Sequence, residues 1–425
     1  MMQHASRLAA AGLAVALALT GCQSGDDGAT SDEVAGEITY AIWDVNQKPA
    51  MQRIIKEFEQ QHPEVSVKLQ LTPWKDYWTK LKTQTSSKTL PDVFWMNGPN
   101  FQTYAAGKQL APITDLVDAG DIDPANYPDD LNAMYSWEDE QYGVPKDYDT
   151  VAIWYNKAIF KKAGVAEPSD DWTWDDYRET AATISKKLKG EGIWGSAEVF
   201  SNTASYYHSI AQAGGHVINA DGTKSGYADP KTQEGVQFWR DLIESGATPD
   251  LDFLAENPGY SLFENGKAAM QWNGSWRVAA MAEAPVKDDV AVAPLPKGRE
   301  RATVIHGLGN VMSAHSKRPA AAKAFLTFLA GKDAALANAE TGAANPAYAG
   351  TQDAWVKSQP GFNLQVFIDA AEQYSRPFPI SKRTENWTKY ESEYLAKAFR
   401  GEMSVEDACN ELAKVMDEEL AKEQS

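Results

Sequence analysis

The sequence predicts an α/β protein of two lobes that are joined by a hinge, with helices at the C-terminal end. Apolar periods of two and of 3.6 alternate along most of the chain, which is typical of largely parallel sheets covered by helices. The stretch 142–164 combines a turn, a polar insert at 146–149, an apolar strand and a short helix. Because one α/β unit precedes this stretch and another follows it, we expect two lobes that meet over a cleft, with ligand-binding groups at the crossing.

The first lobe is expected to begin with a β-α-β-α-β order. Apolar residues alternate along 37–43 and 64–71, and this period of two predicts strands. Helical spacing predicts a helix over 48–61, a second helix is expected at 76–87, and 91–97 is a short buried strand. Successive units of this kind form a largely parallel sheet with right-handed crossovers.

The same periodicity predicts the elements from the hinge onward. Thr173 and Asp176 resemble a capping box, and Ser404 is suited to cap the last helix. Strands are expected at 151–155, 192–197, 268–272, 290–294 and 304–313. Helices are expected at 156–164, 172–189, 203–214, 230–245, 261–266, 319–330, 362–375, 384–400 and 404–422.

The N-terminal end is expected to lie outside the fold. The apolar run 8–19 is shorter than the roughly 20 residues of a membrane-spanning helix, and small residues follow it, which predicts a signal peptide at 1–21. The sequence LTGC at 19–22 resembles the lipobox of bacterial lipoproteins, so cleavage would leave Cys22 to carry a lipid. An ordinary signal peptide that contains a cysteine is the alternative. Residues 22–36 are small, polar and acidic, and we expect a flexible lipidated tether.

Composition excludes several classes of function. The net charge of −19 argues against binding to nucleic acid or to an anionic membrane surface. If Cys22 carries a lipid, Cys409 has no partner, so we expect no disulfide and a buried role for Cys409. The sequence has no zinc-protease, P-loop or nucleophile-elbow motif, and the turn at 219–223 lacks two ligands of a calcium loop. We therefore expect no metal and no cofactor.

Short patterns spread over nearly the whole mature chain resemble the extracellular solute-binding proteins of ABC importers, in the maltose-binding-like class (family 1). Beside the lipobox they are PDV at 91–93, YGVP at 142–145 with YN at 155–156, AGG at 213–215, GKAAM at 266–270 with GSW at 274–276, and GLG at 307–309 with SKRP at 316–319. The resemblance implies a periplasmic-binding-protein-like fold of class II type. One lobe would comprise 37–145 plus 297–345, and the other 146–296 plus 346–425.

The resemblance also implies a function. The protein would be a lipoprotein on the outer face of the cytoplasmic membrane, not an enzyme. It would capture a carbohydrate, expected to be an oligosaccharide, and deliver it to the transmembrane subunits of an ABC permease. Two alternatives stay open. A secreted glycoside hydrolase also has a Trp-lined cleft and uses two carboxylates. A binder of a non-sugar solute, such as a polyamine, also combines Trp with Asp.

The candidate ligand contacts follow from the chemistry of a sugar, which offers an apolar C–H face and a rim of hydroxyls. Trp276 follows a Gly-Ser pair at a strand end, and the resemblance makes it a stacking platform; a core role is the alternative. Trp43 and Asp44 end the first strand, where open α/β sheets bind ligands, although Asp44 could instead cap the next helix. Asn97 ends the third strand together with Trp95, which could be core.

Further candidates lie at the hinge, at helix starts, on the return strand and on a late helix. Several have a structural alternative: hinge hydrogen bonds for Asp147 and Tyr148, stapling of the next helix for Trp74, and burial in the core for His306 and Trp387. These candidates are Asp147, Tyr148, Trp74, Asn202, Tyr206, His306, Gly307 and Trp387.

Overall fold

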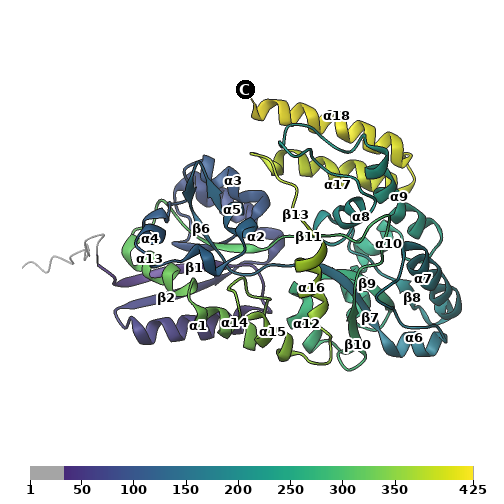
Figure 1. Ribbon diagram of the computed structural model, residues 1–425, viewed down its shortest axis with the longest axis horizontal. Helices are drawn as coiled ribbons and strands as arrows, with labels where there is room; N and C mark the ends of the chain where they lie inside the picture. Colours follow the sequence, from purple (N-terminus) through teal and green to yellow (C-terminus); the bar gives the residue numbers. More distant parts are fainter. Residues whose placement is uncertain (1–32, 425) are drawn as a thin grey trace, which may run out of the picture.

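The structure is a computed structural model that describes residues 33–424, and it has two lobes, each built on a sheet of its own. Figure 1 shows the two sheets side by side along the long axis of the molecule. The predicted signal peptide and Cys22, with most of the predicted tether, lie outside the described residues. Among the described helices, none has both the length and the apolar character that crossing a membrane requires.

The first sheet has five strands in the order β2-β1-β3-β12-β6. The strand β1 pairs in parallel with β2 and β3, which confirms the predicted β-α-β-α-β unit, whereas β12 is antiparallel to both of its neighbours. The bounds are β1 (Gly36–Ile42), β2 (Val65–Leu71), β3 (Val93–Asn97), β6 (Gly143–Pro145) and β12 (Leu308–Met312), with a small hairpin of β4 (Ser136–Trp137) and β5 (Glu140–Gln141) beside them.

Helices surround the first sheet. They are α1 (Lys48–Gln61), α2 (Trp74–Ser87), α3 (Gly98–Ala106), α4 (Thr114–Asp118), α5 (Asp129–Met134), α13 (Pro319–Leu329), α14 (Lys332–Glu340) and α15 (Gln352–Ser358). In α1 the apolar residues at helical spacing are buried, as the period of 3.6 predicts.

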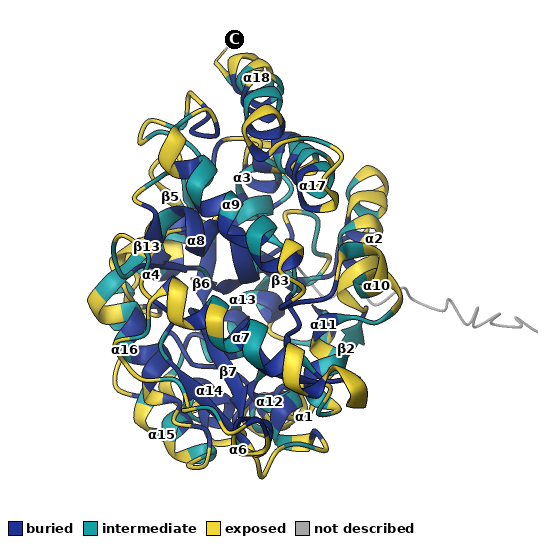
Figure 2. Ribbon diagram, turned by 90° about the vertical axis from the view of Figure 1, so that its right-hand side faces the viewer, coloured by how far each residue is buried: buried dark blue, intermediate teal, exposed yellow. Residues whose placement is uncertain are grey.

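The second sheet has the order β10-β7-β9-β8, and β7 is antiparallel to both neighbours. Every residue of β7, β9 and β10 is buried, so these strands do not alternate between buried and exposed positions, and β9 buries the polar side chains of Gln271 and Asn273 as well. The bounds are β7 (Val151–Asn156), β8 (Trp194–Ser196), β9 (Ala268–Gly274) and β10 (Val290–Ala293). Figure 2 shows the buried strands in the interior and the exposed residues on the outer helices.

The predicted helices of the second half of the chain occur in the predicted order, and two short helices at 251–256 and 278–283 had not been predicted. Together they are α6 (Lys157–Ala163), α7 (Trp174–Leu188), α8 (Tyr207–Gln212), α9 (Pro230–Glu244), α10 (Leu251–Glu256), α11 (Gly259–Glu264), α12 (Val278–Glu283), α16 (Gln365–Tyr374), α17 (Thr384–Arg400) and α18 (Val405–Glu423). The last two lie at the upper edge of the second lobe in Figure 1.

The helix ends confirm several capping predictions. Thr173 and Asp176 form a capping box at the start of α7, and the hydroxyl of Ser404 caps α18. The predicted helix over 203–214 instead begins with a π-helical turn, Asn202–Tyr206, before α8. In this turn the N–H of Tyr206 donates to the carbonyl of Ser201 (3.3 Å), and the Ser205 hydroxyl accepts from the N–H of Ser201 (2.9 Å) and donates to its carbonyl (2.8 Å).

The chain crosses between the lobes more than once, and two of the crossing segments, 146–150 and 305–308, lie next to each other. The N–H of Asp149 donates to the carbonyl of His306 (2.5 Å), and the N–H of His306 donates to the carbonyl of Asp149 (3.1 Å). A Cβ on Gly307 would lie 2.2 Å from the carbonyl oxygen of Asp147, so this close approach requires glycine. The prediction of one strand over 304–313 is wrong here, because the crossing divides it into β11 (Thr303–Ile305), which pairs with β13 (Ser375–Pro377), and β12.

Residues 297–305, which lead back toward the first lobe, make contacts that bear on the lobe boundary expected at residue 297. Three hydrogen bonds connect 297–305 to the second lobe: Trp174 N–H to the carbonyl of Lys297 (3.0 Å), the Gln212 amide to the carbonyl of Ala302 (2.9 Å), and Val304 N–H to Nδ1 of His208 (3.0 Å). These hydrogen bonds favour a crossing between the lobes near His306 and not at residue 297. The rest of the predicted division of the chain into lobes stays a prediction.

Large aromatic side chains fill both cores. Six indoles are fully buried: Trp95, Trp154, Trp239, Trp272, Trp355 and Trp387. Trp154 on β7 packs against Phe362 and Phe367, at ring distances of 5.6 and 5.8 Å, so α16 is tied to the second sheet. Cys409 is a free, buried core residue, as the amphipathic spacing of its helix predicts.

Candidate functional site

A cluster of aromatic rings surrounds Trp43, directly after β1. The ring of Trp43 lies 5.1–5.8 Å from four others, and we call these five residues the Trp43 cluster: Trp43, Trp74, Tyr77, Trp78 and Trp95. The innermost ring, Trp95, is fully buried, Trp43 and Trp78 are half-buried, and Trp74 is 51% exposed. The cluster therefore presents indole faces at the carboxyl end of the first sheet, where open α/β sheets bind ligands.

Asp44 and Asn97 lie at the same edge of the sheet, and both are half-buried. Asp44 accepts hydrogen bonds from the backbone N–H of Asn46 (2.9 Å) and from the amide of Gln47 (3.3 Å), so it organises the loop before α1. The Asn97 carbonyl oxygen accepts from the N–H of Asn100 (3.2 Å) and caps α3. The Asn97 side chain thus caps α3, whereas Asp44 does not cap α1, whose N-cap is Gln47 without a side-chain cap hydrogen bond; each side chain still has exposed surface.

Trp276 stands in the 3₁₀ turn Ser275–Arg277 that follows β9, and it is half-buried. A Cβ on Gly274 would lie 1.8 Å from the Trp276 ring, so the indole can fold back over the chain only because residue 274 is glycine. The ring of Trp276 lies 5.0 Å from that of His306 at an angle of 39°. Burial lowers the pKa of His306 to about 4, so this ring is neutral at physiological pH, and its Nε2 has no hydrogen-bond partner in the described chain.

Charged groups fill the hinge between these two aromatic surfaces. Lys146 Nζ lies 2.8 Å from Oδ2 of Asp147 and 2.8 Å from Oε1 of Gln47, and it stands 4.8 Å above the ring of Trp95. The N–H of Leu308 donates to Oδ1 of Asp147 (3.0 Å). The ion pair therefore ties one crossing segment to the other and both to the first lobe.

Asp149 is a second hinge carboxyl, which the sequence interpretation left out of the site. It is 7% exposed, and the hydroxyl of Ser275 donates to its Oδ1 (2.6 Å). Burial raises the pKa of Asp149 well above its ordinary value, and the neighbouring Asp147 carboxylate adds to this. Asp149 thus lies between the hinge and the turn that carries Trp276.

Arg277 connects the electrostatics of the two lobes and was also missed. It pairs with Glu264 and stands 5.3 Å from the ring of Tyr260, both on α11. Burial lowers the pKa of Arg277, and the carboxylate of Asp44 on the first lobe opposes this shift. Asp44 of the first lobe and Arg277 of the second therefore influence each other electrostatically. The sequence signals were present: Arg277 directly follows Trp276, and Trp78 lies one helical turn after Trp74.

Four of the predicted ligand contacts are largely or fully buried: Trp95, Tyr148, Tyr206 and Trp387. Trp387 is fully buried in the second core, where its Nε1 donates to Ser381 Oγ (2.8 Å). Tyr206 and Tyr148 are 4% and 7% exposed. Trp95 supports the Trp43 cluster from beneath. The structure does not bring Trp387 to the site, because its helical spacing with core residues places it on the inner face of α17.

Asn202 leads to a buried carboxyl in the second lobe. Its amide lies 3.5 Å from Glu391, which is fully buried on α17. The hydroxyls of Tyr207 and Tyr227 donate to Oε1 of Glu391 at 2.8 and 2.6 Å. Burial raises the pKa of Glu391 to about 8 despite these donors. Asn202 thus contributes to the hydrogen bonds around Glu391. It is half-buried, and its role as a ligand contact stays a prediction.

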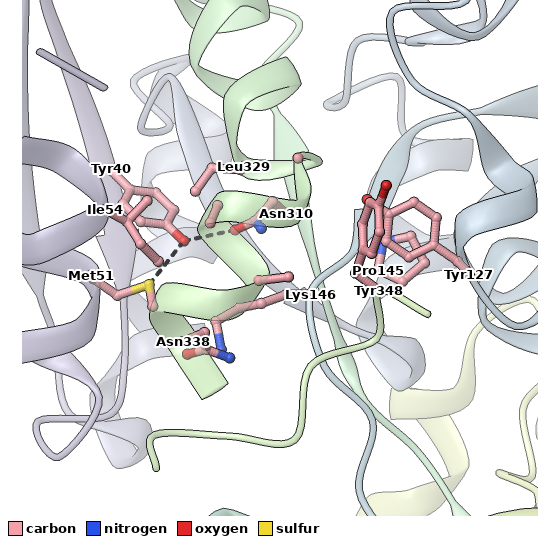
Figure 3. Close-up of a pocket in the computed structure, with 13 residues that line it drawn as sticks. Tyr40, Met51, Ile54, Tyr127, Pro145, Lys146, Asn310, Leu329, Asn338 and Tyr348 are labelled. Atoms are coloured by element: carbon pink, nitrogen blue, oxygen red, sulfur yellow. Dashed lines mark hydrogen bonds between the residues drawn. The ribbon is translucent and has the colours of Figure 1, made fainter. Parts of the chain in front are cut away.

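A small cavity lies in the first lobe beside Lys146, with Tyr40, Asn310 and Asn338 in its lining (Figure 3). Its volume of about 20 Å³ is enough for about one water molecule and not for a larger solute. The hydroxyl of Tyr40 donates to Asn310 (2.7 Å), and the buried Oδ1 of Asn338 has no partner in the described chain. This cavity is therefore too small to hold a sugar.

Comparisons with known proteins agree with this architecture. The family model of the bacterial extracellular solute-binding proteins matches residues 44–336. The diacetylchitobiose-binding protein DasA of Streptomyces coelicolor is 28% identical over 334 residues, which cover 74% of this chain and 75% of DasA. The maltodextrin-binding protein MdxE of Bacillus subtilis is 26% identical over 434 residues, which cover 97% of this chain and 96% of MdxE.

The fold is also found among solved structures. The ABC substrate-binding protein Lmo0181 of Listeria monocytogenes, in complex with cycloalternan, superimposes with a TM-score of 0.85 at 26% identity, over 91% of this chain and 99% of that one. The predicted fold class is thereby confirmed. Since the family model spans well over half of the sequence, the chain belongs to the bacterial extracellular solute-binding proteins, a family that binds solutes and does not convert them.

Proposed function

We propose that this protein is the substrate-binding component of an ABC importer and that it captures an oligosaccharide between its lobes. The observation that supports the ligand class is the pairing of half-exposed indoles with hinge carboxyls, with Trp43 on one lobe and Trp276 on the other. Indole faces stack on the C–H face of a sugar, and carboxyl and guanidinium groups bind its hydroxyls. The names of DasA and MdxE, and the cycloalternan held by Lmo0181, agree with this class.

The proposed contacts combine predicted residues with those that their surroundings suggest. Stacking is assigned to the exposed rings, and hydrogen bonding to the hinge residues and to the charged side chains of Asp44 and Arg277. The proposed set is Trp43, Asp44, Trp74, Trp78, Asn97, Asp147, Asp149, Trp276, Arg277, His306 and the backbone at Gly307.

Tryptophan fluorescence and titration calorimetry test the ligand class. The panel contains maltooligosaccharides, diacetylchitobiose, cycloalternan and spermidine. We expect a sugar to bind, and we expect Trp43→Ala and Trp276→Ala each to weaken binding about tenfold or more, because an aromatic contact of about 1.4 kcal/mol corresponds to a factor of ten.

Trp355→Phe is the matched control. This indole is fully buried, and its Nε1 has no hydrogen-bond partner in the described chain, so its removal leaves the proposed site unchanged. Binding of spermidine alone, or equal weakening in Trp355→Phe, would show that the sugar assignment is wrong.

Membrane attachment through Cys22 is part of the proposal. Lipid on Cys22 would hold the protein on the outer face of the cytoplasmic membrane, and residues 22–36 would let it reach the permease. In a bacterium that processes lipoproteins, the full chain should enter the detergent phase on partitioning, and Cys22→Ala should stay in the aqueous phase. A Cys22→Ala protein that still enters the detergent phase contradicts the anchor.

A further inference from the structure

The hinge contains two buried carboxyl groups and one ammonium group. Asp147 and Asp149 are 1% and 7% exposed, and they lie two residues apart on a segment that crosses between the lobes. The ammonium of Lys146 pairs with Asp147, which also accepts the N–H of Leu308. Among the described residues, no lysine or arginine forms an ion pair with Asp149, which accepts the neutral hydroxyl of Ser275. The hinge therefore has one more carboxyl than it has cations to neutralise.

The titratable groups around Asp149 do not offset this excess of carboxyl groups over cations. Asp44 of the first lobe and Asp147 of the hinge both disfavour a charge on Asp149, and Tyr135 of the first lobe is a neutral phenol whose pKa burial raises well above the ordinary value. From the return segment, His306 is neutral because burial lowers its pKa to about 4. Lys146 favours the charged form of Asp149, but its direct contact is with Asp147.

We propose that Asp149 holds a proton in this arrangement of the lobes and that ligand-driven closure takes up that proton from solution at the hinge. The inference rests on the proposed function. Asp149 lies on a segment that crosses between the lobes: it accepts the Ser275 hydroxyl of the second lobe, and Asp44 and Tyr135 of the first lobe act on it electrostatically. Opening the lobes admits water to the carboxyl and favours its charged form, and closing them removes that water. The proton adds to one carboxylate oxygen, and no other bond changes.

A protonated Asp149 makes the hinge cluster neutral and places an O–H donor beside Trp276. Such a site favours an uncharged, hydroxyl-rich ligand and provides no net charge for a polyamine. Because binding takes up a proton, the affinity for the sugar is greatest at pH values below the Asp149 pKa of the open form. As the pH rises further, the affinity falls by at most about tenfold per pH unit, and it is constant at pH values above the Asp149 pKa of the closed form.

Calorimetry in phosphate and in Tris tests the inference, because the two buffers differ in heat of ionisation. The full chain is titrated with maltotriose, or with diacetylchitobiose if the panel selects it, at pH 6, 7 and 8. We expect uptake of up to one proton per bound sugar in the wild type and in Glu391→Gln, the matched control with a distant buried carboxyl. We expect no uptake in Asp149→Asn. The proposal is overturned if proton uptake persists in Asp149→Asn or is absent from the wild type. It is also overturned if proton uptake disappears in Glu391→Gln.

A second variant covers the case in which Asp149→Asn no longer binds. The Ser275 hydroxyl favours the charged form of Asp149, so Ser275→Ala should move the fall in affinity to higher pH. An unshifted pH profile contradicts the role of Asp149.

Carbon-13 NMR of the aspartate carboxyls in the ligand-free chain separates this inference from the proposed function. If no sugar binds, the proposed function fails. The Asp149 signal, assigned by its loss in Asp149→Asn, should still titrate above the ordinary aspartate range because Asp147 stays beside it. Titration in the ordinary range overturns the inference by itself.

Discussion

The pH dependence of stability should depend strongly on Glu391. Burial raises its pKa from the ordinary 4.5 to about 8 in the folded chain. Between these values the unfolded chain has released a proton that the folded chain retains, so the stability contributed by this group is full at low pH and is lost as pH rises toward about 8. At about 1.4 kcal/mol per pH unit, the difference amounts to at most about 5 kcal/mol.

Glu391→Gln isolates this effect. The amide keeps an oxygen that accepts the hydroxyls of Tyr207 and Tyr227, and it does not ionise. Urea unfolding of both proteins at pH 5, 6.5, 8 and 9 measures the difference in free energy of unfolding. We expect the difference, variant minus wild type, to grow from pH 5 to about 8 and then to stay constant.

Glu393→Gln is the control, since Glu393 lies on the same helix with 55% of its side chain exposed. Its stability curve should run parallel to that of the wild type. If the Glu391→Gln curve is also parallel to the wild type between pH 5 and 8, the argument from burial is refuted.

Three further outcomes are expected. Gly307→Ala should lower the thermal midpoint of unfolding in calorimetry, because its Cβ would lie 2.2 Å from the carbonyl oxygen of Asp147. Gly190→Ala is the control and should leave the midpoint unchanged, because nothing lies within 4 Å of its Cβ. Equal midpoints for the two variants would contradict the close approach at Gly307. Burial lowers the pKa of His208 to about 3, so stability should fall as pH drops below about 6.5, and His208→Gln should flatten that fall in acid titrations followed by circular dichroism. Cys409 is buried and its pKa is raised to about 12, so a maleimide should label it only after unfolding; rapid labelling of the native chain would contradict its core position.

Long elements with a clear apolar period were predicted well, and short ones were not. Strand β1 and helix α1 match their predicted ranges within a residue. The helices α4, α5 and α12 have five or six residues, which is less than two turns, so no repeat of the apolar pattern indicates them. The break at His306 was also missed, because both halves of 304–313 are equally apolar and only their pairing partners differ.

The predicted site residues separate in the same way. Trp43 and Trp276 stand at strand ends, a position that can be inferred from the sequence, and the structure leaves both half-buried. Trp387 was placed by family resemblance on a helix whose spacing favoured the core, and the core is where it lies. Asp149 belonged to the polar insert that the sequence interpretation identified, but its importance depends on Ser275, which lies 126 positions along the chain.

Local patterns in the chain were thus sufficient for the order of most strands and of the longer periodic helices, for several helix caps and for the two-lobe α/β class, because each depends on neighbours within a turn or a strand. The folded arrangement alone decided where the chain crosses between lobes, which indoles keep exposed surface, and which hinge carboxyl lacks a cation. Those properties depend on burial and on charges brought together from distant positions, and burial and charge proximity are what set the energy of an ionisable group.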